Sequence, residues 1–244
     1  MSTIKTENIT KQFEGVHALD GVSLEIPRGR VTGIVGPNGS GKTTLVNVLS
    51  GIVRQDAGVL HIGGKEVSIL KPQQVNAHGI TRTFQEVRLF EQMTVLDNIL
   101  VVVTERAVAA SLFRRRQERC DREARQALET VGLWEKRSSP AAALSYGQRK
   151  LLEIARVLAM REAEVYLFDE PFAGLFPAMV DVVVKVMQGL KQEGKSVVLI
   201  EHSMDLIRQL CDTVIVMDEG KLLAQGTPET VFAKPEVIAI YVGK

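Results

Sequence analysis

The chain has 244 residues, and its 30 lysines and arginines against 29 aspartates and glutamates give a formal net charge of +1. This length suits one large α/β domain with a buried core, and the charge balance gives no electrostatic reason to bind nucleic acid or an anionic membrane surface. Apolar runs such as residues 99–103 are far shorter than the roughly 18 residues that a membrane span needs. The sequence therefore predicts no transmembrane helix.

The N-terminal part of the chain is dominated by strand signals. Short β-branched runs are separated by glycine and proline, which is typical of strands joined by turns. The runs predict strands at residues 3–9, 22–26, 31–35, 59–62 and 80–84.

Residues 36–43 read G-P-N-G-S-G-K-T, the complete phosphate-binding pattern G-x-x-x-x-G-K-[ST], between a predicted strand and a helix expected at 42–49. The glycines let successive backbone N–H groups point at phosphate oxygens, Lys42 can reach the β- and γ-phosphates, and Thr43 offers a hydroxyl to Mg²⁺. The segment predicts binding of a nucleoside triphosphate. The residues expected to contact it are Gly36, Pro37, Asn38, Gly39, Ser40, Gly41, Lys42, Thr43 and Thr44.

Helical periodicity replaces the strand signals from about residue 86 to residue 160. Within this region, residues 114–125 interleave acids with bases, which favours a solvated helix face over a basic binding patch. The sequence L-S-Y-G-Q at residues 144–148 precedes an amphipathic run, so Ser145 is expected to cap a helix whose N-terminal end suits an anion. The region predicts a helical insertion.

Strands and helices alternate in the last third of the chain, a pattern that predicts a parallel sheet covered on both faces. The expected elements are strands at 163–168, 196–200 and 213–217, helices at 177–192 and 204–210, a hairpin turn at 218–221, and short helices after Pro228 and Pro235.

Two carboxylates follow the predicted strand at 163–168. Open α/β sheets bind ligands at the carboxyl ends of their strands. Asp169 is therefore expected in the shell of a Mg²⁺ ion, and Glu170 is suited to polarise the water that attacks a γ-phosphate.

The order of these motifs resembles the ATP-binding-cassette (ABC) ATPase family over essentially the whole chain. In chain order, the motifs are the phosphate loop, Gln85 after a strand, L-S-Y-G-Q, the pair Asp169 and Glu170, and His202 after a strand. The resemblance implies an α/β fold with a P-loop NTPase (RecA-like) core, an antiparallel β-subdomain and an inserted α-helical subdomain. Residues 1–244 would form a single ABC ATPase domain, with core segments 1–85 and 161–244 and the helical subdomain at 86–160.

The resemblance also implies roles for individual residues. Phe13 resembles the aromatic residue that stacks on adenine, with a core phenylalanine as the alternative. Gln85 matches the glutamine that senses Mg²⁺ and the attacking water, and His202 matches the histidine that contacts the γ-phosphate. In this family Ser145, Gly147 and Gln148 would cover the nucleotide held by another subunit.

Two positions depart from the family pattern. Tyr146 stands where many members have glycine, so Gly147 is expected to allow the close backbone approach. Phe176 stands where many members have aspartate or asparagine, and a phenylalanine cannot make the polar contact across the dimer that those residues make. Phe176 therefore argues against tight communication between the two nucleotide sites of a dimer, but it does not argue against hydrolysis itself.

The stretches 81–90, 94–99, 226–229 and 235–238 look like those of branched-chain amino acid importer ATPases. The resemblance implies a prokaryotic ATPase subunit, peripheral on the cytoplasmic face of the membrane, using ATP and Mg²⁺. Its partners would be two integral-membrane permease subunits, a second ATPase chain in a heterodimer or homodimer, and indirectly a periplasmic or extracellular substrate-binding protein. Nucleic acid is not expected as a partner.

Other readings of the sequence remain open. Urea or amide importers and exporters carry similar ATPases, and soluble ABC ATPases act on nucleic acid, although those generally carry two cassettes or added modules. In this family, the region after residue 85 binds the membrane subunit. The apolar residues Leu89, Phe90 and Met93 of that region suit a helix-in-groove contact. Ordinary packing inside the helical subdomain is the alternative for these three residues.

Overall fold

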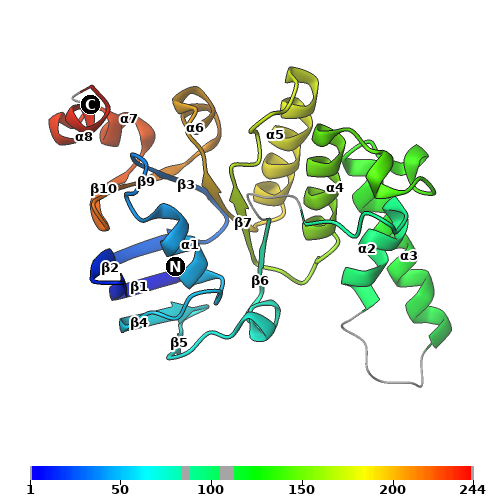
Figure 1. Cartoon of the computed structure of the whole chain (residues 1–244), viewed down its shortest axis with the longest axis horizontal. Helices are drawn as coiled ribbons and strands as arrows, with labels where there is room; N and C mark the ends of the chain where they lie inside the picture. The colour runs from blue at the N-terminus through cyan, green and yellow to red at the C-terminus, as the bar shows by residue number, and fades with distance from the viewer. Residues whose placement is uncertain (1, 84–87, 105–112, 243–244) are drawn as a thin grey trace. The chain divides into compact units, whose positions relative to one another are not determined.

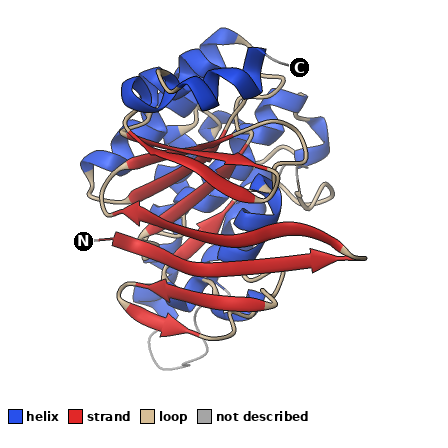
Figure 2. Ribbon diagram, turned by 90° about the vertical axis from the view of Figure 1, so that its left-hand side faces the viewer, coloured by secondary structure: helices blue, strands red, loops and turns tan. Residues whose placement is uncertain are grey.

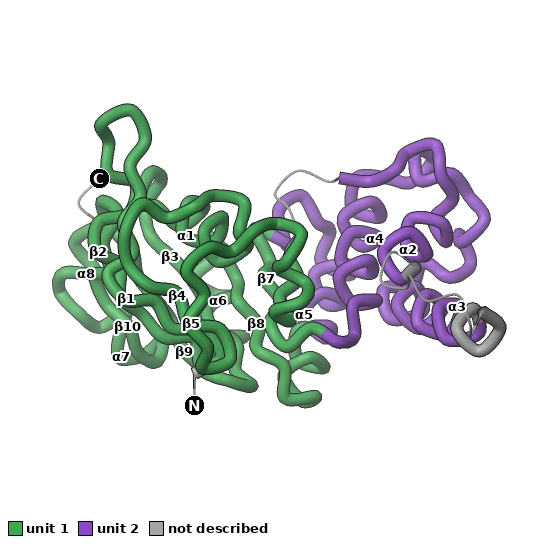
Figure 3. The backbone as a smooth tube through the Cα atoms, turned by 90° about the horizontal axis from the view of Figure 1, so that it is seen from below, with its two compact units in different colours: residues 1–82, 163–170, 187–244 green, residues 83–162, 171–186 purple. Residues whose placement is uncertain are grey.

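The computed structural model describes residues 2–83, 88–104 and 113–242 (Figure 1). The chain forms two compact units, one of residues 1–82, 163–170 and 187–244 and one of residues 83–162 and 171–186 (Figure 3). The sequence predicts residues 171–186 with the core, but they group with the helical unit, where Leu175 and Met179 pack close to Gly147. The division of the chain into functional subdomains stays a prediction.

An antiparallel sheet forms part of the first unit (Figure 2). Its order is β2-β1-β4-β5, built from β1 (Ser2–Phe13), β2 (Val16–Pro27), β4 (Ala57–Ile62) and β5 (Lys65–Val67). The first two strands extend well beyond the predicted segments, because Glu14 and Gly15 have positive φ and close a two-residue hairpin turn in which Phe13 pairs with Val16. The three residues of β5 carry little strand signal and were not predicted; they pair with β4.

The second sheet of this unit has the order β10-β9-β3-β8-β7-β6 and is parallel except for β10. Every residue of β3, β7 and β8 is buried, which explains their continuous apolar sequences. The strands predicted for this sheet and the hairpin before β10 are confirmed, except that Phe84, the last residue of the predicted strand 80–84, lies outside the described residues. The strands are β3 (Val31–Val35), β6 (Ile80–Arg82), β7 (Val165–Asp169), β8 (Ser196–Ile200), β9 (Thr213–Asp218) and β10 (Lys221–Gly226).

Helices cover both faces of the parallel sheet. The helix α1 (Lys42–Leu49) contributes Leu45, Val46, Val48 and Leu49 to one hydrophobic cluster that also contains residues of both sheets. On another side, Ile207 of α6 (Met204–Leu210) and Cys211 lie directly over Gly33 of β3. The predicted α/β fold class is therefore confirmed. This unit also contains α7 (Pro228–Phe232) and α8 (Pro235–Val242). The helix α5 (Pro177–Gln192) is divided, with residues 177–186 in the helical unit and residues 187–192 in this one.

The helical unit contains α2 (Val95–Thr104), α3 (Phe113–Thr130) and α4 (Tyr146–Leu158). Ion pairs join Arg119 to Glu123 and Arg125 to Glu129 along α3, as expected where acids and bases share a solvated helix face. In the parts of the chain that the structure describes, no helix is long and apolar enough to cross a membrane.

A carboxylate holds the amino end of β3. The Oδ2 atom of Asp212 accepts the N–H of buried Val31 at 2.9 Å, and Oδ1 accepts from Lys191 Nζ at 2.6 Å. In return, the N–H of Asp212 donates to the carbonyl of Val31 at 2.8 Å. These bonds fix the first residue of β3, at the opposite end of the strand from the phosphate loop.

Replacing Asp212 with alanine should lower the free energy of unfolding by about 1–3 kcal/mol, because the buried N–H of Val31 loses its acceptor. Asp212→Asn should cost less, since an amide oxygen still accepts. Lys191→Met removes only the part-exposed ion pair and should cost about 0–1 kcal/mol. Urea unfolding measures all three, and an Asp212→Ala loss no larger than that of Lys191→Met would contradict the assignment.

Candidate functional site

The phosphate loop runs from the end of β3 to the start of α1 in a path that requires glycine at two positions. Gly36 and Gly41 have φ values of +148° and +95°. A Cβ atom would lie 2.1 Å from the carbonyl oxygen of Met217 at Gly36, and 2.4 Å from that of Ala18 at Gly41. Any larger residue would force the loop away from β9 or β2, so the glycines of the motif serve this backbone path.

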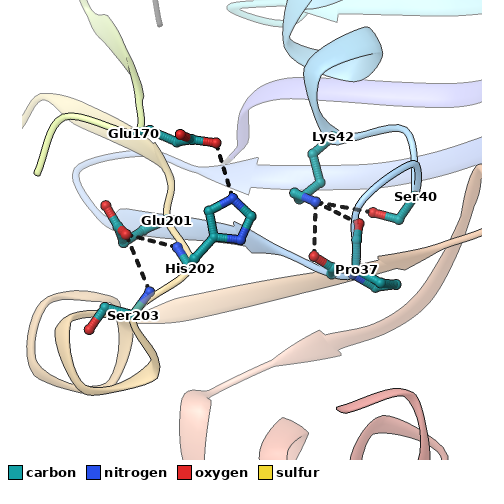
Figure 4. A network of polar contacts seen from close by, with 8 residues as sticks. Pro37, Ser40, Lys42, Glu170, Glu201, His202 and Ser203 are labelled. Carbon is teal, nitrogen blue, oxygen red and sulfur yellow. Dashed lines mark hydrogen bonds and ion pairs between the residues drawn. The ribbon is translucent and has the colours of Figure 1, made fainter. Parts of the chain in front are cut away.

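Lys42 is buried, and its ammonium group is held inside the loop (Figure 4). Its Nζ atom donates to the carbonyls of Gly36 and Pro37, both at 2.8 Å, and to Ser40 Oγ at 3.4 Å. Burial lowers the pKa of Lys42, and the negative charges of Glu170 and Asp169 partly oppose that shift. The lysine of the motif and the two carboxylates therefore act on one another electrostatically.

Asp169 ends β7 as a buried carboxylate beside a buried arginine. Arg82 Nη2 donates to Asp169 Oδ2 at 2.7 Å, and Arg82 Nη1 donates to Asn47 and Ser50 near the end of α1 at 2.6 and 2.9 Å. The guanidinium group thus joins the end of β7 to the helix that follows the phosphate loop. The sequence analysis did not identify Arg82 as a site residue. An arginine at the end of a buried strand needs a partner there, and this requirement was the available signal.

Glu170 and His202, which the sequence singles out far apart in the chain, meet in the structure (Figure 4). Glu170 Oε1 lies 3.0 Å from His202 Nε2. Glu170 has a φ of +48°, which is uncommon for a residue with a side chain, and its N–H donates to the carbonyl of Ile200 at 3.0 Å. The carboxylate is aimed at the imidazole by a backbone conformation that the neighbouring strand end holds.

Glu201 was also missed. Its Oε1 atom accepts the N–H groups of His202 at 2.8 Å and Ser203 at 3.2 Å, so it shapes the turn that carries the histidine. Ser203 then caps α6 by accepting the N–H of Leu206. A carboxylate immediately after a buried strand was the available signal.

Ser145 caps α4, as predicted. Its side chain accepts the N–H of Gln148, and the side chain of Gln148 accepts the N–H of Ser145, which together form a capping box. A Cβ atom at Gly147 would lie 2.5 Å from Met179 Sδ, so the close approach seen here is to the start of α5. A Cβ atom at Gly174 would likewise lie 2.8 Å from Cε1 of the Tyr146 ring.

Phe13 and Phe176 are both exposed, with 46% and 76% of their surface accessible. Phe13 lies at the tip of the β1–β2 hairpin, with Lys11 Nζ 5.1 Å from the ring centroid, so the alternative of a core phenylalanine is wrong. Thr43 and Asn38 are exposed on the phosphate loop, whereas Gln85 lies outside the described residues.

Residues 19–173 match the family model described as ABC transporter. The chain belongs to the ABC transporter family. It is an ATP-binding cassette, and thus an ATPase, as the motif order predicts.

Relatives of this ABC ATPase match it over nearly its whole length. The high-affinity branched-chain amino acid transport ATP-binding protein BraF of Pseudomonas aeruginosa is 37% identical, covering 99% of this chain and 98% of the relative. The probable LivG protein of Archaeoglobus fulgidus is 35% identical, covering 100% and 96%.

Solved structures agree with the fold. A nucleotide-free ATP-binding cassette from an ABC transporter has a TM-score of 0.87 and 33% identity, and the ADP conformation of an ATP-binding cassette has a TM-score of 0.85 and 34% identity. Both matches cover 100% of each chain.

Replacing Phe13 with alanine should raise the apparent KM for ATP several-fold with little change in kcat, because a stacking contact of about 1 kcal/mol would be lost. Stacking reads the face of a base, so GTP should compete appreciably. Val16→Ala is the matched control, since Val16 pairs with Phe13 at the same hairpin tip and is 69% exposed. Steady-state ATPase assays measure KM for the wild type, Phe13→Ala and Val16→Ala. Equal KM values in all three would contradict a role of Phe13 in nucleotide binding.

Proposed function

We propose that this ABC ATPase drives the uptake of branched-chain amino acids by a prokaryotic transporter, from the cytoplasmic face of the membrane. The observation that carries the proposal is the match of 34–37% identity over nearly the full length to proteins named branched-chain amino acid transport ATP-binding proteins. A match that includes the regions outside the common motifs supports a shared substrate class more strongly than the motifs alone.

The phosphate loop would hold the nucleotide. Residues 36–44 supply backbone N–H groups and the hydroxyls of Ser40, Thr43 and Thr44, and α1 adds the positive end of a helix. Lys42 already donates to two carbonyls and a hydroxyl, and a triphosphate would offer its ammonium group stronger, charged acceptors. Phe13 would stack on adenine from the hairpin tip.

The residues present fit Mg²⁺. Thr43, Gln85 and Asp169 offer a hydroxyl, an amide oxygen and a single carboxylate, which are oxygen donors of the kind that this ion prefers, and the charge of Asp169 acts on Lys42 of the phosphate loop. Such a sparse set suits an ion bound largely by substrate phosphates. When bound, Mg²⁺ neutralises negative charge on the phosphate oxygens.

Glu170 would polarise the attacking water, and His202 would contact the γ-phosphate. Their contact of 3.0 Å supports this proposal, because it brings the two groups into one site. Gln85, which lies outside the described residues, would sense Mg²⁺ and the attacking water. Ser145, Gly147 and Gln148 would cover the nucleotide bound by the other ATPase subunit.

Two integral-membrane permease subunits would couple hydrolysis to transport. Phe90 and Met93 are 45% and 40% exposed, while Leu89 is partly buried, so the first two residues in particular suit a groove for a helix of the permease. A periplasmic or extracellular binding protein would deliver the amino acid to the permease.

The Glu170→Gln variant should bind ATP but lose several orders of magnitude in turnover, because the water loses its polarising carboxylate. Membrane subunits that co-purify with the chain are reconstituted with it in vesicles, and uptake of labelled leucine and urea is measured with each protein. We expect ATP-dependent leucine uptake with the wild type alone. Turnover within about twofold of wild type would overturn the role of Glu170, and ATP-driven uptake of urea without leucine would overturn the substrate.

A second ATPase chain, different from this one, would complete the dimer. Phe176 is 76% exposed in the segment where many family members carry aspartate or asparagine. In a homodimer, two such phenylalanines would pack poorly at a polar interface that contains the bound nucleotide. A different partner chain could supply the polar side chain that this chain lacks there.

In a Glu170→Gln background, Phe176→Asp should therefore strengthen self-association with ATP and Mg²⁺, measured by sedimentation. Ile238→Asp is the control, because Ile238 is also exposed, at 47%, but lies on α8. Tight self-dimers that the Phe176 substitution leaves unchanged would contradict the heterodimer.

A further inference from the structure

Glu201 occupies a turn between two elements of the candidate site. It follows the last residue of β8, is 8% exposed, and uses its own carboxylate to accept the N–H groups of the next two residues. Figure 4 shows both bonds on the backbone side of His202, while the ring of His202 is directed at Glu170. The carboxylate thus holds the peptide from which the imidazole projects.

His202 depends on its backbone for its direction. Its side chain is 50% exposed, so packing restrains the ring weakly. The backbone of its partner Glu170 is held by a hydrogen bond, because the N–H of Glu170 donates to the carbonyl of Ile200, the last residue of β8. Both halves of the contact at 3.0 Å are consequently tied to one strand end, Glu170 through Ile200 and His202 through Glu201.

The second carboxylate oxygen of Glu201 is buried and has no hydrogen-bond partner among the residues that the structure describes. Burying a polar atom in this way costs stability, so an apolar residue would suit the position better if only packing mattered. The charge of the group does strengthen the two hydrogen bonds that Oε1 accepts, since bonds to a charged acceptor are stronger than bonds between neutral groups. A group that costs stability and shapes a functional turn points to a role in the site.

We infer that Glu201 is a positioning residue: its carboxylate sets the turn after β8 so that the His202 imidazole meets Glu170. This inference rests on the proposed role of His202 in hydrolysis. Glu201 touches no reacting atom in this scheme and acts through the histidine.

The test is a double-mutant cycle on the full-length chain. Single-turnover hydrolysis of radiolabelled ATP is measured for Glu201→Leu, His202→Ala and the double variant; leucine keeps the buried volume and removes the acceptor. We expect each single substitution to lower the rate about tenfold or more, and Glu201→Leu to lower it less than about twofold once His202 is alanine. The affinity for a fluorescent ADP analogue, which lacks the γ-phosphate that His202 would contact, should be unchanged throughout.

Two further variants separate positioning from general stability. Glu201→Gln keeps an oxygen where Oε1 accepts both N–H groups and should retain the rate within about threefold. Asp212→Ala is the matched control, because Asp212 also accepts a backbone N–H at the end of a strand but lies at the amino end of the sheet. It should lower stability and leave hydrolysis and nucleotide affinity unchanged.

The outcomes are distinguishable. Equal effects of Glu201→Leu with and without His202, or a Glu201→Leu rate equal to wild type, would overturn the positioning role while leaving the proposed function intact. A His202→Ala rate equal to wild type would overturn the role of the histidine and the inference together.

Discussion

The carboxyl ends of four neighbouring strands in one parallel sheet carry the charged groups of the candidate site, and this constraint organises the rest of the structure. The strands β3, β8, β7 and β6 lie side by side in that order. They lead into the phosphate loop, Glu201 and His202, Asp169 and Glu170, and Arg82. Because the interiors of these strands are buried on both faces, polar groups can collect only where the strands end.

Burying so many charges at one edge requires that each be compensated. Arg82 binds Asp169 and two polar groups near the end of α1, and Lys42 binds the carbonyls of its own loop. These contacts tie the helix after the loop to the end of β7. Replacing Arg82 or Asp169 alone would remove the charged partner of the other buried group, which is costly.

The predictable parts of the chain were those governed by local rules. The helices α1, α5 and α6 and the strands β3 and β8 begin and end where apolar periodicity and glycine or proline predict. The cap at Ser145 follows from local chemistry in the same way. The outer half of the β1–β2 hairpin and the short strand β5 escaped prediction, because exposed polar residues form strands there only through pairing with a neighbour.

The sequence by itself determined the α/β class, the phosphate loop and the family, because these depend on residue types at fixed spacings along the chain. Only the tertiary structure decided which groups come into contact. Arg82 contacts Asp169, Glu170 contacts His202, and Glu201 accepts the backbone N–H of His202. Apart from the adjacent Glu201 and His202, the partners are separated by many residues and come together only through the order of strands in the sheet. That order is set by long-range packing, which no local pattern encodes.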